Sequence, residues 1–155
     1  MFSSVDGLPL HPLVVHAVVV LLPLATLGAL AVAARPRWAR TFSPLVAGAA
    51  VVAAVAAVVA AEAGEALQAT LLSQGDPLEG IQDHASYGET ARNLGLGFAV
   101  AAVVSAFLVR RSAEGSRRPR LVGWLTVLFG LAATVYVYLA GESGAESVWG
   151  YVYGS

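Results

Sequence analysis

Residues 11–40 read HPLVVHAVVVLLPLATLGALAVAARPRWAR, a long uncharged apolar run that stops at a cluster of three arginines. The hydrocarbon core of a bilayer is about 30 Å thick and needs roughly 20 helical residues at 1.5 Å each. The run is long enough to cross a bilayer as a single helix, and the arginines mark the point where that helix reaches the membrane surface. This stretch therefore predicts a transmembrane helix.

Three further apolar runs follow the first, and together they define the fold class. We predict an all-α, four-helix transmembrane bundle, a single integral-membrane domain over residues 1–155 with spans at about 12–34, 44–65, 90–110 and 120–141. Residues 80–92 extend the third helix outward, and the second run, built almost entirely of Ala, Val and Gly, should pack most tightly. Hydrophobic residues make up 57% of the chain and charged residues 12%, about half the share of charged residues in soluble domains.

The basic residues set the expected orientation. All nine are arginines, and all but Arg92 lie in the first and third connections, namely Arg35, Arg37, Arg40, Arg110, Arg111, Arg117, Arg118 and Arg120. Short basic loops stay in the cytoplasm, so both termini and the central loop should be extracytoplasmic. We expect a multi-pass protein of a bacterial cytoplasmic (inner) membrane whose partner is the lipid bilayer. The net charge of −1 gives no reason to expect nucleic-acid binding.

All three histidines fall near the outer ends of the predicted helices. Counting from the arginines at 1.5 Å per residue places His16 about 28 Å and His84 about 39 Å away. Ionisable groups at such a depth mark a functional site by default. His16 lies deepest, where an unpaired imidazole is costly, so we expect it and His84 to matter most. His11 lies five residues before His16, about 140° around a helix, so the two cannot both face one metal. The alternative is that these histidines are solvated residues at helix ends and only form hydrogen bonds there.

Four short motifs resemble a known family. They are Gly7-Leu-Pro-Leu-His11-Pro-Leu-Val-Val-His16, Gly64-Glu65-Ala66, Asp83-His84-Ala85 and Gly141-Glu142-Ser143-Gly144. Together they resemble bacterial membrane proteins grouped as domain of unknown function 2231, over nearly the whole chain. Relatives in that family occur fused to Rieske iron–sulfur domains, which implies a haem or electron-transfer role. The family usually carries Gly-His-x-Gly where this chain has Glu142, so one histidine that the resemblance implies is missing here.

The first functional interpretation is a b-type haem protein that transfers electrons on the extracytoplasmic side. Imidazoles from two helices can bind one haem iron axially, and His84 opposite His16 or His11 would supply them. Arg92 is placed to pair with haem propionates, since its guanidinium matches carboxylates. A salt bridge to Glu89 or Glu62 is the equally weighted alternative for Arg92.

The second interpretation is a site for a Zn, Cu or Fe ion without a porphyrin. Neutral imidazoles and carboxylates suit these metals, and His11, His16, His84, Glu65 and Glu142 would supply the ligands. The third is a cofactor-free accessory subunit of a larger membrane complex. The sequence leaves open whether the chain forms a homo-oligomer and which redox partner it meets. It supports no enzymatic substrate, because the middle of every span is uncharged.

Overall fold

The computed structural model describes residues 4–5, 8–74, 81–113 and 116–153. A short antiparallel hairpin of β1 (Ser4–Val5) and β2 (Leu8–Pro9) precedes four helices, α1 (Leu10–Ala34), α2 (Pro36–Gln74), α3 (Ile81–Arg111) and α4 (Arg117–Tyr153). The four helices confirm the all-α prediction, and the two-residue strands are an addition that the sequence did not suggest. The extension of the third helix back to residue 81 is also confirmed.

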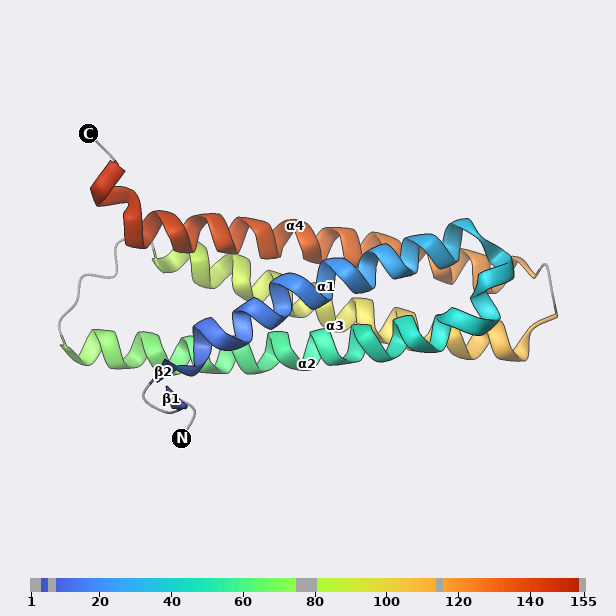
Figure 1. Cartoon of the computed structure of the whole chain (residues 1–155), viewed down its shortest axis with the longest axis horizontal. Helices are drawn as coiled ribbons and strands as arrows, with labels where there is room; N and C mark the ends of the chain where they lie inside the picture. The colour runs from blue at the N-terminus through green and yellow to red at the C-terminus, as the bar shows by residue number, and fades with distance from the viewer. Residues whose placement is uncertain (1–3, 6–7, 75–80, 114–115, 154–155) are drawn as a thin grey trace.

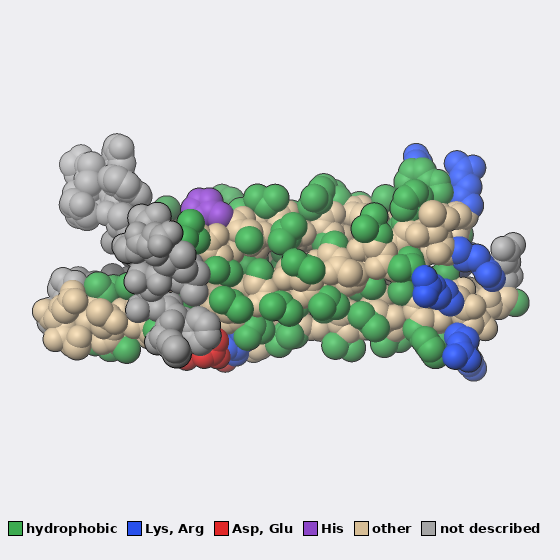
Figure 2. Space-filling view, turned by 60° about the horizontal axis from the view of Figure 1, so that its bottom comes forward, with side chains coloured by type: hydrophobic (Ala, Val, Ile, Leu, Met, Phe, Trp, Pro, Cys, Tyr) green, Lys and Arg blue, Asp and Glu red, His purple; other side chains and the backbone are tan. Residues whose placement is uncertain are grey.

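The helices run alternately up and down and form one bundle (Figure 1). Each packs against its neighbours in the chain, and α4 returns to pack against α1, which leaves α1 and α3 on one diagonal. All four are long and apolar enough to cross a membrane. The arginine side chains gather where α1 meets α2 and α3 meets α4 (Figure 2), here called the arginine end. The opposite end, where α1 and α3 begin, is called the histidine end.

Helix α2 is longer than the membrane span predicted at about 44–65, since it begins at Pro36 and continues to Gln74. Proline fits the first position of a helix, where its missing N–H has no partner to lose. Pro44 lies inside the helix, where proline removes a backbone hydrogen bond and bends the axis. The first turns of α2 accordingly cross the arginine end before the helix turns along the bundle (Figure 1). Ser43 is buried at this bend.

The centre of the bundle is built from small side chains. The buried residues of α2 are Ser43 and seven alanines, at positions 47, 50, 53, 54, 57, 60 and 63. Small residues allow backbones to approach closely where lipid provides no hydrophobic drive for association. In the most apolar part of α2, 39% of residues are buried, against 22–28% in the other helices, which confirms α2 as the most closely packed. Large side chains such as Val20, Leu24 and Leu45 are exposed around the bundle.

The two helical hairpins repeat the same pattern of burial. His11 and His84 occupy equivalent positions when α1 is laid on α3. In that register the buried residues of α1, Val18, Leu22, Ala25, Thr26 and Ala29, fall on Ala91, Gly95, Phe98, Ala99 and Ala102 of α3, which are all buried. Leu22 also packs against Gly95 across the diagonal, 3.5 Å from where its Cβ would be. The bundle is therefore pseudo-two-fold symmetric, with the axis running along its centre.

Candidate functional site

Two histidines from diagonal helices meet at the histidine end. His11 is the second residue of α1, and His84 is the fourth residue of α3. Their ring centroids lie 5.9 Å apart, and the ring planes are nearly perpendicular, at 83°. Since the two positions are equivalent in the repeat, this contact lies on the pseudo-two-fold axis.

Each imidazole is held by the backbone of the next helix in its own hairpin. His11 Nδ1–H donates to the carbonyl oxygen of Ala60 in α2, and His84 Nδ1–H donates to that of Ala140 in α4, both at 2.8 Å. A carbonyl oxygen can only accept, so the proton of the neutral ring resides on Nδ1. The Nε2 atom of each ring then carries a free lone pair. This is the tautomer of a metal-binding histidine whose second nitrogen is held by a backbone carbonyl.

A glycine lies against each ring, one helical turn after the carbonyl that holds it. A Cβ at Gly64 would lie 3.0 Å from His11 Cε1, and a Cβ at Gly144 would lie 2.8 Å from His84 Nδ1. The distance at Gly144 is shorter than any ordinary Cβ contact and that at Gly64 is tight, so a side chain at either position would require the ring to shift. Gly64 follows Ala60 by the same number of residues as Gly144 follows Ala140. Each hairpin therefore holds its histidine ring between one backbone carbonyl and one glycine, an arrangement that we call the imidazole cradle.

The structure separates His16 from this pair. Its side chain is exposed, and its Nδ1–H donates to the carbonyl oxygen of Pro12 within the same helix. The five-residue spacing rotates His16 away from the direction that His11 takes. The structure thus brings together His11 and His84, and it leaves the deepest histidine on the outer face of α1.

The remaining candidate residues do not join the pair. The side chains of Glu65 and Glu142 are exposed, and no group of three or more His, Asp or Glu residues is placed to hold a metal ion among the described residues. Arg92 forms an ion pair with Glu89 at 3.5 Å, and its Nε–H donates to Asn93 Oδ1 at 3.3 Å. Arg92 therefore makes the salt bridge to Glu89 that the sequence offered as the alternative to a haem propionate.

Comparison with known protein families identifies the family of this chain. A family model described as "Predicted membrane protein (DUF2231)" matches residues 7–155. The chain belongs to the DUF2231 family. The match spans both histidines of the pair and both glycines of the cradle, and it confirms the resemblance carried by the sequence motifs. No curated protein and no solved structure matches this DUF2231 chain.

Sequence reasoning missed the two glycines and the two carbonyls of this DUF2231 site. A signal for them was present, because Ala60-x-Glu-x-Gly64 and Ala140-x-Glu-x-Gly144 share the same pattern. In these segments the sequence predicted Glu142 as a ligand, whereas the alanine and glycine positions make the contacts with the histidines. The Glu side chains at positions 62 and 142 are exposed.

Proposed function

We propose that this DUF2231 protein binds haem b between His11 and His84 and transfers electrons on the extracytoplasmic side of a bacterial cytoplasmic membrane. The observation that supports the proposal is the pair of neighbouring imidazoles, each of which donates Nδ1–H to a backbone carbonyl and so keeps the lone pair of Nε2 available. Histidine is a common ligand of haem iron, and His11 and His84 come from two separate helices.

The spacing of the pair fits a shared iron atom. A metal–nitrogen bond is about 2 Å, and an imidazole nitrogen lies about 1 Å from the ring centre, so two axial imidazoles have centroids about 6 Å apart. The observed separation is 5.9 Å. The ring planes differ in direction because each ring is oriented by its own backbone carbonyl, His11 by Ala60 and His84 by Ala140.

The glycine cradle supports the same conclusion. Helix interiors favour residues other than glycine by about 1 kcal/mol, and Gly64 and Gly144 both lie inside helices. These glycines therefore lower the stability of the helices, but they leave room for the two histidine rings. A fixed ring orientation is what a metal ligand requires. A bound haem would supply one-electron chemistry, and His11 and His84 are the residues that would hold it.

The location of the site follows from the arginine bias. The arginine end carries eight of the nine basic residues, and short basic loops remain in the cytoplasm. The histidine end is then extracytoplasmic. The proposal therefore places the haem toward the outer leaflet, within reach of a redox partner outside the membrane.

A metal ion without a porphyrin is the second candidate, and the filled core beneath the pair favours it. Val18, Ala60 and Ala91 belong to one buried apolar cluster at this half of the bundle, so a flat macrocycle would have to extend toward the open end of the bundle, whereas a single ion needs no such room. Imidazole suits Zn, Cu and Fe. Such an ion would take its remaining ligands from water or from a partner.

The test is the absorbance spectrum and metal content of the detergent-purified protein from haem-supplemented cells. We expect a red protein whose spectrum after dithionite is that of a reduced six-coordinate b-type haem. His11→Ala and His84→Ala should each abolish this spectrum, and His16→Ala, at an exposed position, is the matched control that should keep it.

Other outcomes decide between the alternatives. A colourless protein carrying about one equivalent of Cu or Zn, lost in the His84→Ala variant, would replace haem by a metal ion. A protein with neither haem nor metal would leave the cofactor-free subunit of a membrane complex. Loss of the haem spectrum in His16→Ala alone would show that the deepest histidine is the ligand.

A further inference from the structure

The arginine end carries a positive charge that the chain itself does not balance. The two connections at this end, residues 35–40 and 110–120, contain eight arginines and one acid, Glu114, so their net charge is +7. All eight arginine side chains are exposed, and Figure 2 shows arginine side chains gathered around this end of the bundle. The acidic residues that the structure describes all lie toward the histidine end. The balancing negative charge therefore has to come from outside the chain.

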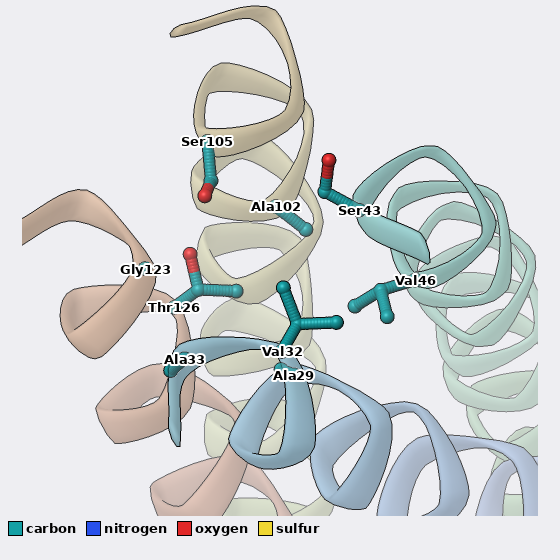
Figure 3. Close-up of a pocket in the computed structure, with 9 residues that line it drawn as sticks. All are labelled: Ala29, Val32, Ala33, Ser43, Val46, Ala102, Ser105, Gly123 and Thr126. Atoms are coloured by element: carbon teal, nitrogen blue, oxygen red, sulfur yellow. The ribbon is translucent and has the colours of Figure 1, made fainter. Parts of the chain in front are cut away.

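The interior of the bundle at this end offers no partner for these charges. Figure 3 shows the space that the four helices surround here, and the residues that line it are alanine, valine, glycine, serine and threonine. None of these lining residues is charged. The arginines at this end therefore lie at the surface, where a guanidinium can meet an anion with matching geometry.

A hydrogen bond connects the two basic connections at one corner of the bundle. An Arg40 Nη2–H donates to the carbonyl oxygen of Ser112 at 3.2 Å, and so joins the second turn of α2 to the residue that follows α3. Arg111 is the last residue of α3 and directly precedes Ser112. Arg37 lies three residues before Arg40, on the same side of α2. We call Arg37, Arg40 and Arg111 the basic corner.

Aromatic side chains accompany the arginines at this corner. The guanidinium of Arg111 lies over the ring of Phe107, 5.2 Å from its centre and one helical turn closer to the middle of the bundle. In α2 the rings of Trp38 and Phe42 are in edge contact, with centroids 5.9 Å apart. Tryptophan is enriched where a bilayer meets water, so this corner lies at the level of the lipid headgroups. Phe107 is 56% exposed, which places an apolar surface directly beside the charge.

We propose that the basic corner binds an anionic phospholipid of the bilayer. The phosphate group accepts hydrogen bonds from the guanidiniums, and the acyl chains lie against exposed apolar side chains such as Phe107 and Leu45. Clusters of basic residues next to membrane-spanning helices bind anionic headgroups. A soluble anion would match the charge but would leave the apolar surface uncovered. A zwitterionic lipid would cover that surface without supplying net negative charge.

The test is native mass spectrometry of the detergent-purified full chain with phosphatidylglycerol or phosphatidylcholine of identical acyl chains. We expect phosphatidylglycerol to bind at least about tenfold more tightly, because phosphatidylcholine has no net charge. Glycerol 3-phosphate carries the phosphate without acyl chains, and it should not displace bound phosphatidylglycerol at equal concentration. Equal binding of the two lipids would overturn the proposal, and so would displacement by glycerol 3-phosphate.

Substitutions test the position of the lipid. Each arginine beside an anionic lipid contributes about fivefold in affinity, so Arg40→Gln/Arg111→Gln should weaken phosphatidylglycerol binding about 25-fold. Arg40→Lys/Arg111→Lys keeps both charges and should bind within about fivefold of the parent chain, because lysine also binds phosphate. An equal loss in the lysine and glutamine variants would show that Arg40 and Arg111 act only through the fold, and would overturn the proposal.

The matched control removes the same charge from a different helix. Arg117→Gln/Arg118→Gln takes two arginines from the start of α4 and should weaken binding by less than about fivefold, since only unspecific attraction is lost. A loss equal to that of Arg40→Gln/Arg111→Gln would show that the lipid responds to the total charge of this end, and would overturn a site at the basic corner.

Discussion

Replacing Gly144 by alanine is the sharpest test of the imidazole cradle. The new Cβ would lie 2.8 Å from His84 Nδ1, so the ring has to retreat by about 0.6 Å to reach an ordinary contact of 3.4 Å. The hydrogen bond from Nδ1–H to the Ala140 carbonyl is 2.8 Å long, and a retreat of that size takes it beyond the usual range of 2.7–3.2 Å. We therefore expect the substitution to break this bond.

Two opposing terms decide the effect on stability. Alanine in place of glycine inside a helix gains about 0.5–1 kcal/mol, and loss of one hydrogen bond costs about 0.5–1.5 kcal/mol, to which the displaced ring adds its lost packing. The net change for Gly144→Ala is thus a small destabilisation. Gly141→Ala is the matched control in the same helix, since a Cβ at Gly141 meets nothing within 4 Å. Gly141→Ala should therefore keep the full gain in stability that alanine brings to a helix.

The assay is unfolding of the purified protein in mixed micelles as SDS is added, followed by circular dichroism. We expect Gly141→Ala to be more stable than Gly144→Ala by about 1–2 kcal/mol. In a His84→Ala background the clash is absent, so Gly144→Ala should behave like Gly141→Ala, and the double-mutant cycle isolates the contact. Equal stability of the two glycine variants in the wild-type background would refute the cradle.

The remaining predictions concern the other half, the outer arginine and the topology. Gly64→Ala should destabilise the protein relative to Gly48→Ala, whose Cβ meets nothing within 4 Å, by the same unfolding assay; equal effects would break the symmetry argument. Arg92→Ala should change the free energy of unfolding by less than about 1 kcal/mol, because its ion pair has a largely exposed partner; a larger loss would indicate another role. Reporter fusions after Arg37 should read cytoplasmic and fusions near Gly75 extracytoplasmic; the reverse pattern would invert the proposed orientation.

Length and hydropathy determined the membrane-spanning architecture from the sequence. Crossing a bilayer depends on the transfer free energy of a continuous segment, which is a sum over neighbouring residues and needs no knowledge of their partners. The four spans and the separation of arginines from histidines could therefore be read in order along the chain. The full lengths of the helices could not be read in this way, because α2 extends beyond the predicted span at both ends and passes through Pro44.

The identity of the facing histidines was decided only by the tertiary structure. Between His16 and Ala34 helix α1 is uncharged and carries a single polar side chain, Thr26, so its sequence has no polar face to show which side meets the bundle. Depth favoured His16, yet the rotation of α1 turns His11 toward His84 and leaves His16 exposed. That rotation depends on how small residues of four helices fit together, and close approach of backbones has no signature in local hydropathy.

The sequence by itself determined four membrane-crossing helices, an arginine end, a histidine end and the family resemblance. The tertiary structure alone decided that His11 and His84 form a pair, that Gly64 and Gly144 make room for them, and that Ser43 is buried at the bend of α2. The physical reason is that spanning a bilayer is a property of each segment, whereas a site between helices depends on contacts among residues far apart in the chain.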